Sequence, residues 1–341
     1  MRSALLGLGL VLLTAGPAAA DLATGADALT RGDYKAAIAE LGRTKGPDAG
    51  KARLLQVDAQ LTVGDLKGAE ATATAASKDA DPVVATNGKV ALADVLRTTG
   101  RIADAQKLLE AVVGADPGHR PARRALARLL MATGKLPAAD ALWKRTIDEY
   151  NAKVLDLDKP ADLFALAEAA RWRGEFELAN DAYREAVNLA PSSIEAGLAW
   201  ADLFRSKYEV EVAEQTYDEV LKVNPNQPDA HAGIAAAIVE SRYDLATARH
   251  HLDAALAVNP RHVGALLVRA SIEIDQNQWD AAGKTLAEVR AVDPQSLPAL
   301  ELEATIAWLR DDLPRYEQLK AKALAQNPVD ADLYRTIARS A

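Results

Sequence analysis

The side chains best suited to metal binding or proton transfer near neutral pH are the five histidines of the chain. A histidine that binds a metal from one helix usually has a second histidine or a carboxylate four residues away. None of the five has such a neighbour, and the adjacent His250 and His251 would point about 100° apart on a helix. We therefore expect surface residues and no metal site. The five are His119, His231, His250, His251 and His262.

Sequence motifs of the common enzyme classes are also missing. The chain contains no His-Glu-x-x-His, no Gly-x-Ser-x-Gly and no cysteine. Gly283-Lys284-Thr285 is the nearest approach to a phosphate-binding loop, but Gln278 stands where its first glycine should be. The segment 275–280 lacks the central glycine and distal glutamate of a calcium loop. We expect a protein that is not an enzyme and needs no cofactor.

Prolines recur at a nearly constant interval and indicate a repeated structural unit. Eight of them are separated by 35, 35, 74, 34, 35, 34 and 34 residues, and the long interval spans two units plus a short insertion. Proline cannot continue a helix, so each one marks a helix end. The eight are Pro47, Pro82, Pro117, Pro191, Pro225, Pro260, Pro294 and Pro328.

Three other positions keep their distance from this proline in the regular units. A small residue twelve positions before it lets two helices approach closely, and a large residue four positions later fills the space between units. A glycine five positions before the small residue suits a left-handed turn. The small residues are Ala105, Ala179, Ala213, Ala248 and Ala282, with Ala37, Ala69 and Ala139 in the less regular units; the large ones are Leu41, Leu109, Trp143, Tyr183, Tyr217, Leu252 and Leu286; the glycines are Gly32, Gly64, Gly100, Gly134 and Gly174.

The period of about 34 residues, the turn Gly174-Glu175-Phe176, the Ala-x-x-x-Tyr pattern and the Asn/Asp-Pro terminators resemble tetratricopeptide repeats. The resemblance covers nearly all of the chain after residue 20. It implies an all-α fold, a right-handed α-solenoid of about nine helix-turn-helix units plus a C-terminal helix. The expected units are residues 21–47, 51–82, 83–117, 120–160, 161–191, 194–225, 229–260, 263–294 and 297–328, with a capping helix at 329–341.

Two segments depart from the regular pattern. The insertion at 148–160 is expected to continue the second helix of the fourth unit by about two turns, to an end near Asp158. A tolerated loop extension is the alternative. In the ninth unit, Tyr316 occupies the position of the small residue and Lys320 that of the large one, so its packing should differ.

The first twenty residues are typical of a secretory signal. They carry one early positive charge at Arg2, a short apolar run, and an Ala-x-Ala site that ends at Ala20. The run is too short to span a membrane. We expect cleavage after Ala20, a periplasmic or secreted protein, and a single domain over 21–341 with no membrane span. Without the signal the net charge becomes −9, which disfavours nucleic-acid binding.

The resemblance also implies where a ligand would bind, because the first helices of such arrays line a concave face. The arginines expected on this face could bind carboxylates of an extended peptide, with Trp172 as an aromatic anchor. Alternatively, acidic and basic residues three positions apart neutralise each other within one helix, in the pairs Asp94–Arg97, Glu168–Arg171 and Asp202–Arg205. Only Arg124 and Arg128 lack an acidic residue three or four positions away. The candidate groove residues are Arg97, Arg124, Arg128, Arg171, Trp172 and Arg205.

Composition and motifs together favour a non-catalytic scaffold that binds a protein or peptide in the bacterial cell envelope or secretion apparatus. The alternative is an interaction module of a secreted zinc-metallopeptidase-type system whose catalytic part is not in this chain. The sequence Glu149-Tyr150-Asn151 and the segment 203–208 are similar to arrays that lead into such a domain. Polysaccharide binding is the least favoured hypothesis, because it would need more exposed aromatic residues than the 16 among 341 offer.

Overall fold

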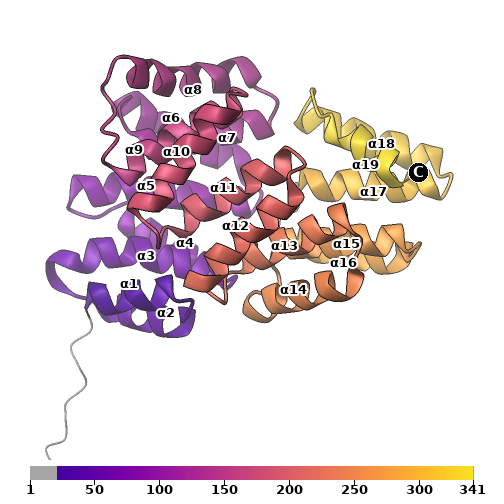
Figure 1. Cartoon of the computed structure of the whole chain (residues 1–341), viewed down its shortest axis with the longest axis horizontal. Coiled ribbons are helices and arrows are strands. Elements are labelled where there is room, and N and C mark those ends of the chain that lie inside the picture. The colour runs from indigo at the N-terminus through magenta and orange to yellow at the C-terminus, as the bar shows by residue number, and fades with distance from the viewer. Residues whose placement is uncertain (1–20, 341) are drawn as a thin grey trace, which may run out of the picture.

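Residues 21–340 are described by a computed structural model, with the side chains of residues 339 and 340 excepted. Over this range the regular secondary structure is entirely helical (Figure 1). The predicted signal segment, residues 1–20, lies outside it. The helices are α1 (Leu22–Thr30), α2 (Tyr34–Arg43), the 3-10 helix η1 (Gly46–Asp48), α3 (Ala49–Thr62), α4 (Leu66–Ala76), α5 (Pro82–Thr98), α6 (Ile102–Ala115), α7 (Arg120–Ala132), α8 (Leu136–Asn151), α9 (Pro160–Trp172), α10 (Phe176–Leu189), α11 (Ile194–Ser206), α12 (Val210–Val223), α13 (Pro228–Ser241), α14 (Leu245–Val258), α15 (Val263–Asp275), α16 (Trp279–Val292), α17 (Leu297–Leu309), α18 (Leu313–Gln326) and α19 (Asp332–Ser340).

Consecutive helices pack as antiparallel pairs, from α1 with α2 to α17 with α18, and α19 packs on α17. The first helices of adjacent pairs also contact each other, as α13 and α15 do. The pairs therefore stack into a curved superhelix (Figure 1). This is the all-α solenoid that the sequence predicts.

The small and large residues of the repeat pack as predicted. Every one of them is at most 3% exposed, including Ala179 and Tyr183 in the fifth pair. Because the small side chain lets the helices approach, the large one on the next turn is enclosed by both neighbours. Burial of each large side chain contributes roughly 1.5–3 kcal/mol. Within the parts of the chain described, these interfaces hold each pair to the next.

A residue with left-handed backbone follows the first helix of each pair. The five predicted turn glycines have φ between 69° and 79°. The four later turns adopt φ of 53–63° without glycine, at Tyr208, Tyr243, Asn277 and Asp311. Since the later turns reach this conformation with a side chain, the glycines of the early turns must serve a second purpose.

That purpose is a line of contacts between distant parts of the chain, which we call the seam. A Cβ atom on the turn glycine of each of the first four pairs would overlap a side-chain oxygen of an Asn or Asp that ends the second helix of another pair. The two partners are 192–195 residues apart each time. Around Gly174, the next turn along, a Cβ would meet nothing within 4 Å. The seam consists of Gly32–Asn224, Gly64–Asn259, Gly100–Asp293 and Gly134–Asn327.

Hydrogen bonds reinforce the seam. Asn224 Nδ2 donates to the Tyr34 hydroxyl at 3.0 Å, and Asn226 Nδ2 donates to the carbonyl of Gly32 at 3.2 Å. Further along, Arg261 Nη2 donates to the carbonyl of Gly64 at 3.3 Å. Pairs one to four thus contact the ends of pairs six to nine in order, and α1–α4 lie beside α12–α14 (Figure 1).

The insertion at 148–160 does not continue the second helix of the fourth unit by two turns, so that prediction is wrong. Helix α8 ends at Asn151, and residues 152–159 form a loop. Lys153 has a φ of 57°, and Lys153 and Val154 donate backbone hydrogen bonds to Tyr150 and Glu149, which ends the helix. Leu155 is 7% exposed, so the loop contributes to the core.

The ninth pair is also well packed, but its large buried residue lies one position earlier than the repeat pattern predicts. Tyr316 is 7% exposed and meets the ring of Trp308 edge-on, with centroids 5.2 Å apart. Leu319, rather than Lys320, fills the position of the large residue and is 2% exposed. Leu333 of α19 is fully buried in the same cluster.

Two buried carboxyl groups meet where α19 joins this cluster. Glu301 is 7% and Asp330 6% exposed. Asp330 Oδ1 accepts from the backbone N–H of Asp332 at 3.0 Å, at the start of α19. Burial, followed by the charges of Asp330 and Asp332, raises the pKa of Glu301 to about 8. Glu301 is therefore mostly protonated at neutral pH.

The seam can be tested with Gly64→Ala and its matched control, Gly174→Ala. Both place an alanine at positive φ, which costs about 1 kcal/mol. Only Gly64→Ala also pushes Asn259 aside, so we expect a further loss of roughly 1–3 kcal/mol. Urea unfolding measures the difference, and small-angle X-ray scattering should show a larger radius of gyration for Gly64→Ala alone. Equal behaviour of the two variants would contradict the seam.

The buried carboxyl pair predicts a dependence of stability on pH. Because the pKa of Glu301 is about 8 in the folded chain and 4.5 ordinarily, the folded state binds the proton more tightly. Stability should therefore fall as pH rises from about 4.5 to 8. Glu301→Gln should weaken this fall and raise stability at pH 8 by about 3 kcal/mol. Thermal melts at pH 5 to 9 test this, with the exposed Glu317→Gln as control.

Candidate binding site

The arginines predicted to line the groove lie on α5, α7, α9 and α11, and all of them have intramolecular partners. Arg97 donates to Asp94 Oδ1 of its own helix, from Nε at 2.9 Å and from Nη2 at 2.7 Å. The side chains of this pair are 52% and 48% exposed. This is the one pairing within a helix that the sequence analysis anticipated correctly.

The other arginines pair between helices. Arg128 Nε of α7 donates to Glu168 Oε2 of α9 at 2.6 Å, and Glu168 also accepts from the Tyr183 hydroxyl at 2.5 Å. Arg171 donates to the carbonyls of Ala199 (3.1 Å) and Asp202 (3.3 Å) in α11. The expected pair Glu168–Arg171 is not formed, because Glu168 is 1% exposed and already holds two donors.

Arg205, Arg124 and Trp172 complete the set. Arg205 Nη1 of α11 donates to Glu240 Oε1 of α13 at 3.1 Å, so the expected pair with Asp202 is not formed. Arg124 Nη2 donates to Glu195 Oε1 at 2.7 Å, and its guanidinium lies 4.3 Å from the ring centre of Phe164. Trp172 is 41% exposed, with the Arg171 guanidinium 5.4 Å from its ring centre.

These contacts link the first helices of successive pairs, and we call them the ladder. It consists of the contacts of Arg124, Arg128, Arg171 and Arg205. Each rung links a guanidinium to an acceptor on the next pair or the pair after it. A ligand carboxylate would have to displace those acceptors before it could bind. The peptide clamp on these residues therefore stays a prediction.

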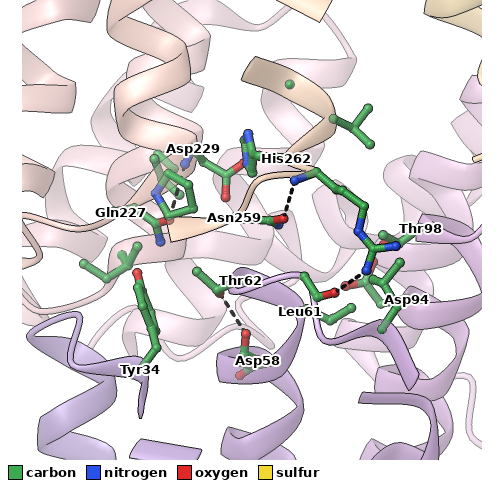
Figure 2. Close-up of a pocket in the computed structure, with 18 of the residues that line it drawn as sticks. Tyr34, Asp58, Leu61, Thr62, Asp94, Thr98, Gln227, Asp229, Asn259 and His262 are labelled. Atoms are coloured by element: carbon green, nitrogen blue, oxygen red, sulfur yellow. Dashed lines mark hydrogen bonds and ion pairs between the residues drawn. The ribbon is translucent and has the colours of Figure 1, made fainter. Parts of the chain in front are cut away.

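A cavity lies elsewhere, between the two halves that the seam joins (Figure 2). It has a volume of about 700 Å³, within the range of about 300–1,000 Å³ of ordinary ligand sites. Residues of pairs one to three form one wall, and residues of pairs six to eight form the other. The lining includes Tyr34, Asp58, Asp94, Arg97, Asp229 and His262.

Carboxylates dominate the charge of this cavity. Asp58, Asp94, Glu195, Asp229 and Asp293 line it, against the cations Arg97 and Arg261 and the imidazole of His262. His262 and Asp229 lie 3.0 Å apart at Nε2 and Oδ1. The side chain of Asp58 is exposed at the cavity wall.

Sequence reasoning missed this cavity, because it joins residues that are far apart in the chain. The one available signal was the restriction of the turn glycine to the early units. It also missed the contact of His231 and His251, whose Nδ1 atoms lie 3.0 Å apart on α13 and α14. Within residues 21–340 the structure contains no group of three or more potential ligands arranged to hold a metal. No helix in this range is long and apolar enough to cross a membrane.

Comparison with known proteins finds a matching repeat family in two parts of the chain. The family model described as "Tetratricopeptide repeat" matches residues 96–153 and 241–306. No curated protein sequence matches the chain. Solved structures that resemble it include a tetratricopeptide repeat protein from Parabacteroides merdae, at 16% identity and a TM-score of 0.44, which covers 86% of this chain and 99% of that one.

Two further structures are similar at the same level. Yeast Tom70 is 14% identical with a TM-score of 0.45, covering 93% of this chain and 86% of that one. YrrB, described as a repeat protein with an unusual peptide-binding site, is 15% identical with a TM-score of 0.33, covering 52% and 89%.

The ladder can be tested by comparing Arg128→Ala with Arg97→Ala. Removing Arg128 leaves Glu168 buried without its cation, and we expect a loss of roughly 3 kcal/mol in the free energy of unfolding. Removing Arg97 breaks an exposed pair and should cost about 0–1 kcal/mol. Urea unfolding at pH 7 measures both. Similar losses would show that the rungs are no stronger than surface ion pairs.

Proposed function

We propose that this all-helical solenoid, in which residues 96–153 and 241–306 match the tetratricopeptide repeat, is a non-catalytic scaffold that binds a segment of a partner protein in the cavity between its two halves. The observation that carries this proposal is the cavity itself. It is enclosed by six helix pairs, and polar side chains converge on it from both walls. Such a site recognises its ligand by shape and by a few fixed polar groups.

We further propose that it works in the bacterial cell envelope or a secretion system. The support is the composition of residues 1–20, which is typical of a secretory signal. The acidic balance of the remaining chain favours a protein partner over a nucleic acid.

A pull-down from envelope extract tests the proposal. Residues 21–341 are immobilised as wild type, as Thr98→Trp, which fills part of the cavity, and as Ala111→Trp, an exposed control on α6. We expect a partner that wild type and control retain and that Thr98→Trp loses by at least tenfold. Thermal melts confirm that all three are folded.

A third variant, Arg124→Gln, separates the cavity from the row of arginines. Retention that depends on Arg124 and not on Thr98 would place the ligand on the ladder and overturn the cavity as the site. Absence of any partner retained by the wild type would count against the scaffold function.

A further inference from the structure

Two histidines meet beside the seam, and a carbonyl group fixes the roles of their ring nitrogens. The Nδ1 atoms of His231 in α13 and His251 in α14 lie 3.0 Å apart, with ring centres 5.3 Å apart. His231 Nε2 lies 3.0 Å from the carbonyl oxygen of Pro225. A carbonyl oxygen only accepts, so the neutral His231 carries its proton on Nε2, and its Nδ1 accepts from the Nδ1–H of His251. The hydrogen bonds therefore run from His251 through His231 to Pro225.

The carbonyl that His231 binds lies between two residues of the seam. Asn224 Nδ2 donates to the Tyr34 hydroxyl at 3.0 Å, and Asn226 Nδ2 donates to the carbonyl of Gly32 at 3.2 Å. The backbone N–H of Asn226 donates to Asn224 Oδ1 at 3.1 Å, which ties the two asparagines to each other. His231 is thus bound to the loop that joins the sixth pair to the first.

The contact between the two rings can hold one added proton but not two. A proton on Nε2 of His251 leaves the Nδ1–H of that ring in place as a donor. A second proton would have to enter at Nδ1 of His231, where two N–H groups of two positive rings would face each other across 3.0 Å. The rings must therefore separate when both are charged.

Burial opposes the protonation of both rings while they are in contact. It is the main cause that lowers the pKa of His251 to about 4, and the charge of His231 is the second cause. Burial also lowers the pKa of His231. Once the rings separate into water, each pKa returns towards its ordinary value of about 6.5. The separated form then binds more protons between these values, so acidification favours it.

Charged groups near the pair act in both directions, and burial outweighs them. Two carboxylates on α12 favour the charged rings, but an arginine donates to one of them at 2.7 Å. The neighbouring histidine on α14 opposes a charge on either ring. A histidine at the start of α15 is paired with a carboxylate of α13 at 3.0 Å. These groups are Glu214, bound by Arg242, and Asp218 on α12; His250 on α14; and Asp229 on α13 with His262 at α15.

We propose that the contact between His231 and His251 is a pH-sensitive switch, which keeps the seam closed at neutral pH and opens it when both rings are charged. Because the His231 ring is bound to the loop, its movement away from His251 displaces the two asparagines. The seam tolerates little displacement, since its hydrogen bonds to this loop are already 3.0–3.4 Å long and a contact of about 3.6 Å is no longer a hydrogen bond. Tyr34 and Asn224 also line the cavity, so an open seam alters its wall. The switch goes beyond the proposed function, because it acts whether or not the cavity holds a ligand.

The chain contains no cysteine, so two spin labels can be placed on opposite sides of this seam contact. Lys35→Cys and Lys222→Cys put them at exposed positions of α2 and α12. Double electron–electron resonance on residues 21–341 then measures the distance between the labels at pH 7.5 and pH 5. We expect a single short distance at pH 7.5 and an added longer one at pH 5, with the ratio of open to closed molecules higher by about tenfold.

Two substitutions remove the second charge and keep a hydrogen bond. His231→Gln retains an N–H group that can donate to Pro225, and His251→Asn retains an amide that can face His231 as donor or acceptor. With either substitution we expect the short distance at both pH values. His250→Gln changes the exposed neighbour outside the hydrogen-bonded chain, and this matched control should open like the wild type.

Circular dichroism at pH 5 confirms that each variant is folded, and either of the two histidine variants is sufficient for the comparison. An unchanged distance in the wild type between pH 7.5 and pH 5 would overturn the switch. Opening of His231→Gln or His251→Asn at pH 5, or loss of the response in His250→Gln, would overturn it as well. The effect predicted for Glu301 cannot imitate this result, because it stabilises the chain as the pH falls.

Discussion

The architecture depends on the close approach of a turn glycine to the Asn or Asp that ends a helix nearly two hundred residues away. In most solenoids each repeat contacts only its neighbours, and the curvature is the sum of many small rotations. Here four such contacts join the two halves, and a side chain at any of the four glycines would have to displace the Asn or Asp side chain that it meets. The cavity follows directly, since its two walls are the surfaces that the seam holds face to face.

Buried charged side chains connect neighbouring helices of the solenoid. Glu168 joins Arg128 of one pair and Tyr183 of its own pair, and Arg171 reaches carbonyl groups of the next pair. Burying such groups is costly unless every donor and acceptor is matched. The ladder therefore contributes more to the relative placement of helices than to net stability, and this placement shapes the concave wall.

The repeats were predictable from sequence because their determinants are local. Proline, small residue, large residue and turn glycine recur at fixed distances, and the structure confirms the burial of residues such as Ala213 and Tyr217. The pairing of charges was less predictable. Glu168 and Arg171 are three residues apart, yet each is bound by another helix, because burial allowed a better partner than the local one. The cavity was not predictable from a period of 34 residues, since it arises from contacts across more than five repeats.

The seam also determines how the molecule responds to tension. An open solenoid extends easily under tension, because each interface between repeats deforms slightly. In this chain the seam contacts from Gly32 to Gly134 connect the first four helix pairs to pairs six to nine. Separating the two halves requires breaking polar contacts between them, such as that between Tyr34 and Asn224. The protein should therefore resist small extensions more than an open solenoid does, and the cavity should open when these contacts break.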